Sequence, residues 1–233
     1  MESKKPLALT ILDIVSIVLL AIATYLALVF APKELVMGDV QRVFYFHIGT
    51  AWTALIGFIL AAVFSVTYLI AKDLKWDRLE VAAIEVSMVF FFITIVLGSI
   101  WARPAWNTWW TWDPRLTTAA VTELIYAAYF MLRQGIDDPE KRARFGAVYA
   151  LIGGLSAPIT FFAIRFFRTI HPVVIGGGNA EAQGGFAMTA DMRVAFFFAL
   201  FAFTVIFIDL FWHRVRLGEL QNKVEQMKLQ ASI

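Results

Sequence analysis

The chain alternates long apolar segments with short polar ones. Six segments carry few or no charges, and most of them reach or approach the roughly 20 residues that an α-helix needs to cross a bilayer. The pattern predicts an all-α integral membrane protein built as a bundle of six transmembrane helices. The expected spans are Leu7–Ala31, Val43–Ala71, Val81–Ile100, Leu116–Leu132, Phe145–Ile164 and Val194–Trp212.

The composition supports the same class. Hydrophobic residues make up 60% of the 233 residues and charged residues only 16%, which is far from a soluble domain. The first apolar segment is too long for a signal-peptide core and lacks a small-residue cleavage site before Pro32, so we expect a retained anchor. The net charge of +2 is dispersed between helices and does not favour nucleic-acid binding. Without cysteine, the chain has no disulfide, thiolate metal site or thioether attachment of heme.

The distribution of lysine and arginine predicts the orientation. Six crossings place both termini on one side, and with the termini inside, thirteen of the 20 basic residues lie in inner segments and seven in outer ones. This bias predicts cytoplasmic N- and C-termini. The segment between the third and fourth helices then lies at the outer surface.

The C-terminal segment has apolar residues at heptad-like spacing, which predicts a short amphipathic helix. We therefore expect a transmembrane domain at 1–212 and a cytoplasmic amphipathic tail at 213–233. A solvated tail and a docking face for a cytoplasmic ATPase or a small membrane partner are equally compatible with this pattern. The sequence has no nucleotide-binding loop. The apolar positions are Leu217, Leu220, Val224 and Met227.

The outer segment WARPAWNTWWTWDPRLTT contains five of the eight tryptophans, more than an interfacial aromatic belt requires. Large flat faces with N–H donors suit a planar apolar ligand with polar edges. Heme fits this description, because its iron takes two imidazoles and its propionates pair with arginine. Arg103 and Arg115 flank the tryptophans and are candidate propionate partners. The proposed platform consists of Trp101, Trp106, Trp109, Trp110 and Trp112.

Two of the three histidines share the side of the tryptophan segment. His47 is expected at the outer start of the second helix and His171 in the outer loop between the fifth and sixth helices, so they bracket the segment as candidate iron ligands. Small residues around His47 suggest a fixed ring. His171 precedes Pro172 and a glycine-rich stretch, which suggests a movable one. His213 follows a tryptophan at the inner end of the sixth helix and is expected to be an interface anchor.

The dipeptide Asp113-Pro114 is a strong signal for the start of the fourth helix, with aspartate as the N-cap and proline in the first turn. We therefore expect Asp113 to fix the exit of the tryptophan segment rather than to react.

The run from Trp106 to Thr117, WNTWWTWDPRLT, resembles the WWD signature Trp-Gly-x-x-Trp-x-Trp-Asp-x-Arg-Leu-Thr of heme-handling membrane proteins. With its length and six expected helices, the chain resembles the heme exporter protein C (CcmC) family of cytochrome c maturation over essentially its whole length. An outer histidine flanks the signature on each side in that family, which corresponds to His47 and His171. The departure is Asn107 in place of glycine; asparagine tolerates a left-handed backbone, so we expect the turn to persist.

The resemblance implies heme delivery rather than turnover catalysis. Heme b, held non-covalently by His47 and His171 and by the tryptophans, Asp113 and the arginines of the segment, would be presented at the outer face of the bacterial inner membrane. The implied recipient is a membrane-tethered periplasmic heme chaperone. Subunits of an ATP-binding cassette (ABC) transporter and a small membrane subunit of the same pathway are implied as further partners.

Two other functions remain open. Glu85 and Glu123 lie within expected spans, and intramembrane carboxylates often mark a transport path, so a permease is the second hypothesis. The absence of a convincing inverted repeat weakens it. A b-type membrane electron carrier is the third hypothesis, but neither His47 nor His171 falls near the midpoint of an expected helix.

Overall fold

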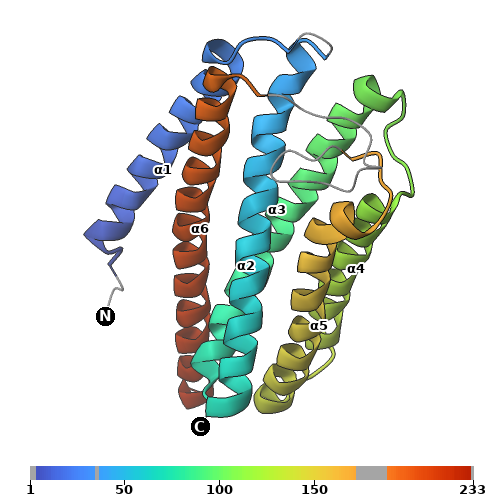
Figure 1. Cartoon of the computed structure of the whole chain (residues 1–233). Coiled ribbons are helices and arrows are strands. Elements are labelled where there is room, and N and C mark those ends of the chain that lie inside the picture. Colours follow the sequence, from blue (N-terminus) through green and yellow to red (C-terminus); the bar gives the residue numbers. More distant parts are fainter. Residues whose placement is uncertain (1–3, 35–36, 172–187, 232–233) are drawn as a thin grey trace.

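The computed structural model describes residues 4–34, 37–171 and 188–231. Within these ranges six long α-helices run lengthwise beside one another (Figure 1), and the predicted all-α membrane architecture is confirmed. A π-helical segment (Leu26–Phe30) prolongs the first helix, and a 3-10 turn (Asp39–Arg42) precedes the second. The helices are α1 (Leu7–Tyr25), α2 (Val43–Ala71), α3 (Leu74–Trp106), α4 (Pro114–Gln134), α5 (Pro139–Phe166) and α6 (Ala190–Ala231).

Five of the helical segments among the described residues are long and apolar enough to cross a membrane. α4 is not one of them, because its 21 residues include Arg115, Glu123 and Arg133. A sixth crossing by α4 therefore stays a prediction. The five segments are Leu7–Phe30, Asp39–Ala71, Leu74–Trp106, Pro139–Phe166 and Ala190–Lys228.

α3 extends beyond its predicted apolar span at both ends. Asp73 caps its start by accepting the Lys75 N–H at 2.8 Å, and the helix continues past Ile100 to Trp106 with Pro104 in its last turn. Pro104 has no N–H to donate to the Ile100 carbonyl, so α3 loses one hydrogen bond in the turn before it ends. The prediction of a loop was therefore wrong for Trp101–Trp106, and the irregular segment comprises only residues 107–113.

Small residues let the helices approach closely. The Tyr126 ring of α4 stacks on Phe58 of α2, with ring centroids 4.1 Å apart and an interplanar angle of 7°. On the other side of Tyr126, a Cβ at Gly153 of α5 would lie 2.5 Å from the ring, so only glycine fits. Close contact through small residues is the usual way in which helices pack in membranes. α1 lies outside this core and packs against α6 (Figure 1).

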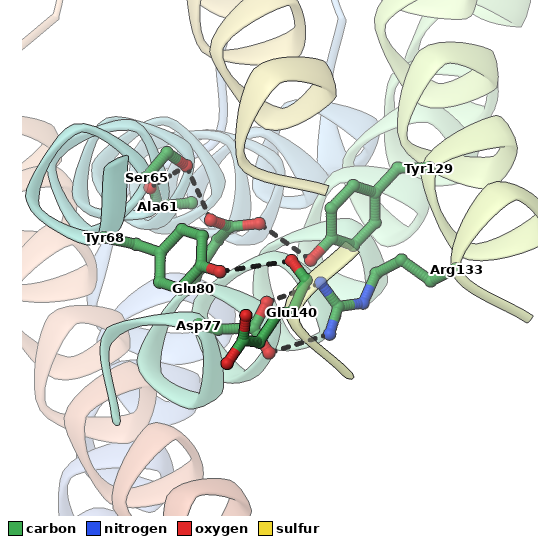
Figure 2. A network of polar contacts seen from close by, with 8 residues as sticks. All are labelled: Ala61, Ser65, Tyr68, Asp77, Glu80, Tyr129, Arg133 and Glu140. Atoms are coloured by element: carbon green, nitrogen blue, oxygen red, sulfur yellow. Dashed lines mark hydrogen bonds and ion pairs between the residues drawn. The ribbon is translucent and has the colours of Figure 1, made fainter. Parts of the chain in front are cut away.

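A buried polar network ties α2, α3 and α4 together (Figure 2). Asp77 and Glu80 of this network are in the first turns of α3, whereas the tryptophan segment lies at the other end of that helix. Arg133 makes two hydrogen bonds to Asp77, at 2.6 and 2.9 Å. The Glu80 carboxylate accepts hydrogen bonds from the hydroxyls of Ser65 and Tyr129, both at 2.9 Å. Each charged group thus has polar partners, as burial requires.

The two carboxylates that suggested a permease differ in their surroundings. Glu85 forms a two-pronged ion pair with Arg214 of α6, with one bond of 2.9 Å. The Oε2 atom of Glu123 is buried and has no hydrogen-bond partner among the described residues. Glu85 therefore has a structural role between α3 and α6.

The helix expected for the C-terminal tail is part of α6, which continues through Trp212 to Ala231. The boundary predicted between 212 and 213 coincides with no break in the helix, so a separate tail domain stays a prediction. The four apolar positions of the tail are exposed: Leu217, Leu220, Val224 and Met227.

Candidate functional site

A cavity of about 330 Å³ lies at the end of the bundle that carries the tryptophan segment. Residues of α2 to α6 and the segment after α5 line it, and most of them are apolar or aromatic. The ionisable side chains in its lining are His47, His171, Arg115 and Arg165. The cavity therefore combines an apolar body with two imidazoles and two guanidinium groups, which suits a large apolar ligand with acidic edges.

The two outer histidines come together in this cavity. The ring centroids of His47 and His171 lie 6.4 Å apart, with an interplanar angle of 34°. His47 is in the second turn of α2, whereas His171 lies beyond the end of α5. Neither imidazole is near the middle of a helix, as expected from the sequence.

The orientation of the His47 ring is fixed by α3. Its Nδ1 lies 2.9 Å from the backbone oxygen of Thr94, and because a carbonyl can only accept, Nδ1 carries the proton. Nε2 then has the lone pair that can bind a metal. The Thr94 hydroxyl in turn donates to Thr50 at 2.8 Å, and Thr50 bonds back to the His47 carbonyl at 3.0 Å.

Gly98 provides the space for this ring. A Cβ at Gly98 would lie 3.0 Å from Cε1 and 3.3 Å from Nδ1 of His47. Thr94 and Gly98 are one helical turn apart and present an acceptor and a gap to the same imidazole. Neither residue is recognisable from the sequence alone, because the pairing depends on the register between α2 and α3.

His171 is connected to the start of α4. Its backbone N–H donates to the Thr169 hydroxyl oxygen at 3.1 Å, and that hydroxyl donates to Oδ2 of Asp113. The other oxygen of Asp113 accepts the Leu116 N–H at 2.9 Å, which is the predicted N-cap. Asp113 thus links α4 to the segment that carries His171. The glycine-rich stretch after this histidine lies outside the described residues, and its predicted mobility remains a prediction.

Three of the five tryptophans line the cavity. The Trp106 ring makes edge contacts with Trp101, at a centroid distance of 5.3 Å, and with His171, at 6.3 Å. The Nε1 atoms of Trp101 and Trp110 are buried and have no hydrogen-bond partner within the described part of the chain. Buried donors of this kind normally have a partner, so these two N–H groups are suited to an acidic or carbonyl group of a ligand.

The other two tryptophans face away. Trp109 is 58% exposed and Trp112 is 76% exposed, and neither lines the cavity. The Ser99 hydroxyl donates to the Trp109 carbonyl at 2.6 Å, and Trp112 makes an edge contact with Trp110 at 5.6 Å. The segment therefore has an inner aromatic face and an outer one, rather than the single platform expected from its composition.

The two arginines that flank the tryptophans, Arg103 and Arg115, lie in different surroundings. Arg115 lines the cavity, where its guanidinium lies over the Phe161 ring at 5.7 Å and donates to the Phe161 carbonyl at 3.2 Å. Arg103 is outside the lining and donates to both the backbone oxygen and Oδ1 of Asn107, each at 2.6 Å. Arg165, at the end of α5, also lines the cavity, although nothing in the sequence pattern singles it out.

Asn107 ends α3 in the left-handed conformation expected of the position, with φ 56° and ψ 24°. The predicted tolerance of asparagine there is confirmed. Its side chain adds an acceptor for Arg103 that glycine could not offer. Arg103 thus closes the turn that leads into the tryptophan segment.

Comparison with known proteins gives one consistent result. The family model for heme exporter protein C (CcmC) matches residues 4–230. The heme exporter protein C of Escherichia coli is 30% identical over 207 residues, covering 88% of this chain and 81% of the relative. That of Bradyrhizobium diazoefficiens is 28% identical over 214 residues, covering 92% and 80%. The matched region includes every lining residue of the cavity.

Proposed function

The chain belongs to the heme exporter protein C family, and from this premise we propose that it binds heme non-covalently in the cavity and presents it to a heme chaperone. Membership of this family implies a role in heme handling for cytochrome c maturation. Heme is the cargo in this proposal, and the protein's residues hold and release it. The observation that carries the proposal is the pair of imidazoles in one aromatic cavity that also contains arginine.

The separation of the imidazoles suits a shared iron. With metal–nitrogen bonds of about 2 Å and a ring nitrogen about 1.1 Å from its centroid, two axial imidazoles have centroids about 6.2 Å apart. The rings of His47 and His171 are 6.4 Å apart. His47 is the anchored ligand, because the Thr94 carbonyl holds its Nδ1 and leaves Nε2 for the metal.

The remaining groups of the cavity match the rest of a heme. Trp101, Trp106 and Trp110 offer faces and edges to the macrocycle. Arg115 and Arg165 are the propionate partners that we propose in place of Arg115 and Arg103, because Arg103 is used to close the α3 turn. Arginine is suited to this role because its planar donors match a carboxylate.

The exposed tryptophans suit transfer rather than binding. Trp109 and Trp112 lie on the outer surface, and Trp112 touches Trp110, which lines the cavity. We assign these two rings to the contact with a membrane-tethered periplasmic chaperone, because exposed tryptophans are frequent anchors of protein interfaces. The assembly in the bacterial inner membrane, with cytoplasmic termini, ABC transporter subunits and a small membrane subunit, belongs to the same proposal.

The visible spectrum of the detergent-purified protein tests the ligands. Replacement of His47 or His171 with glycine should convert a six-coordinate low-spin heme into a five-coordinate one, and free imidazole should restore the original spectrum. His213→Gly is the matched control and should leave the spectrum unchanged. If both cavity variants retain the low-spin spectrum without imidazole, the iron has other ligands.

A second comparison separates binding from transfer. Trp110→Ala should weaken heme binding about 2- to 12-fold, the scale of about 0.5–1.5 kcal/mol for an aromatic contact beyond area burial. Trp112→Ala should retain heme but load the chaperone more slowly. Equal effects of both variants on heme affinity would contradict the division between the inner and outer aromatic faces.

The other two functions are less well supported. A permease based on Glu85 is weakened by its ion pair with Arg214. A b-type electron carrier is weakened by the position of His47 near a helix end and of His171 outside the helices. Transfer of heme to an added chaperone domain would separate delivery from both alternatives.

A further inference from the structure

A second cluster of metal-binding residue types lies where α1 packs against the middle of α6, outside the lining of the cavity. Asp13 comes from α1, and Asp209 and His213 come from α6. One ligand atom from each residue lies within 4.8 Å of the others. Nothing in the proposed function uses these three side chains.

The helical spacing explains why two of the ligands converge. Asp209 and His213 are four residues apart on α6, so their side chains lie on the same face. The same i, i+4 spacing brings two zinc ligands together in helical metalloprotease motifs. Nε2 of His213 is 3.6 Å from Oδ1 of Asp209 and 2.7 Å from Oδ1 of Asp13. Atoms bound to one zinc ion at about 2.0–2.2 Å lie about 3–3.6 Å apart, so small side-chain shifts suffice.

The state of Asp209 is the second observation that points to a ligand. Its side chain is 10% exposed, and its buried Oδ1 makes no hydrogen bond among the described residues, although Nε2 of His213 approaches it to 3.6 Å. This oxygen is the one that faces His213. A buried carboxylate oxygen is costly without a hydrogen bond, and a cation between it and the imidazole would satisfy it.

The cluster has the charge and access that a cation needs. Lys5 pairs with Oδ2 of Asp13, which leaves Oδ1 for the cluster. Two carboxylates against one lysine leave a net negative charge when His213 is neutral. The His213 side chain is 42% exposed, so protein atoms do not enclose the cluster on that side.

We propose that Asp13, Asp209 and His213 bind one divalent first-row transition-metal ion of the zinc class, which joins α1 to α6. One imidazole and two carboxylates favour this class over calcium or magnesium, which prefer ligand sets made of oxygen alone. The ion would fasten α1, the helix that lies outside the bundle core, to its neighbour. This site is independent of heme binding.

Zinc binding to the full-length protein in detergent tests the proposal. The variant His47→Ala/His171→Ala serves as the background, because the cavity imidazoles can themselves bind zinc. We expect this background to bind one zinc ion per chain, with an unchanged affinity in excess magnesium. Asp209→Asn and His213→Ala should each weaken zinc binding at least tenfold, whereas Glu219→Gln, a matched change of an exposed carboxylate on α6, should have no effect.

Lys5→Ala distinguishes a metal site from a simple ion-pair network. Removal of the lysine leaves all three ligands in place and eliminates a competing cation, so zinc should bind at least threefold more tightly. This variant also decides the matter if a ligand variant fails to fold. A background protein without bound zinc, ligand variants that bind like the background, or an unchanged or weaker affinity in Lys5→Ala would each overturn the proposal.

Discussion

Gly98→Ala is the most direct test of how the bundle positions His47. The added Cβ would lie 3.0 Å from Cε1 of the imidazole, whereas carbon atoms in contact are about 3.5–4.0 Å apart. The ring must therefore move by about 0.5 Å or more. A movement of this size away from α3 lengthens the 2.9 Å hydrogen bond from Nδ1 to the Thr94 carbonyl to about 3.4 Å, close to the limit of a hydrogen bond.

The expected loss follows from that hydrogen bond. A typical hydrogen bond contributes about 0.5–1.5 kcal/mol net, so heme affinity should fall about 2- to 12-fold. Protein stability should not fall in parallel. Replacement of glycine by alanine inside a helix favours the helix by about 0.8–1.0 kcal/mol, and this gain offsets much of the local strain.

Heme titration followed at the Soret band, together with thermal unfolding of the heme-free protein in detergent, measures both quantities. Gly218→Ala on α6 is the matched control, because its Cβ would meet only the end of the Arg214 side chain, at 3.4 Å. Wild-type heme affinity in Gly98→Ala would refute the role of Gly98. A melting temperature that falls as steeply as the affinity would point to general disruption instead.

Two further predictions concern the whole bundle. If the termini are cytoplasmic, Lys33→Cys should react with an impermeant thiol reagent in intact cells and Asp137→Cys should not, and the opposite pattern would invert the orientation. Asp77→Ala leaves Arg133 largely buried and unpaired, which should cost about 3–5 kcal/mol in thermal or denaturant unfolding, and replacing both residues with apolar ones should cost less. Equal losses in the single and double variants would show that pairing is not what stabilises this network.

The helices were predictable because long apolar runs are required for membrane burial. The predicted start and end of α2 match the structure, whereas α3 and α6 extend well beyond their apolar spans. Hydropathy reports where a helix meets lipid, and a helix can continue into water as long as its residues favour it. The last turns of α3, with Trp101 and Trp106, lie beyond the predicted apolar run.

The site was predictable at the level of which end of the bundle its residues occupy. The number of helices between them placed His47 and His171 at the same end of the bundle, and their rings do meet there. The number of helices does not determine how a helix is rotated about its axis or which path a short loop takes. The sequence therefore could not separate the tryptophans that line the cavity from those that face outward, or select Arg165 over Arg103.

Thr169 allows two roles of Asp113 to be tested separately: the capping of α4 and the connection to the segment that carries His171. Its hydroxyl accepts the His171 N–H and donates to Oδ2 of Asp113, while Oδ1 caps α4. Thr169→Val removes the hydroxyl, and with it the connection between His171 and Asp113, but preserves the shape of the side chain. The cap of α4 and the melting temperature should therefore be unchanged. Asp113→Ala removes both this connection and the cap. Loss of the cap alone should lower the free energy of unfolding by about 0.5–2 kcal/mol.

The two variants should therefore share a ligand defect but differ in stability. In Thr169→Val we expect faster heme dissociation and a smaller six-coordinate fraction, restored by free imidazole, because His171 is no longer held against α4. Thr169→Ser retains the hydroxyl and should behave as wild type. If Thr169→Val keeps the wild-type spectrum and dissociation rate, Asp113 acts on this site only as a helix cap, and contacts such as that with Trp106 hold His171 without Thr169.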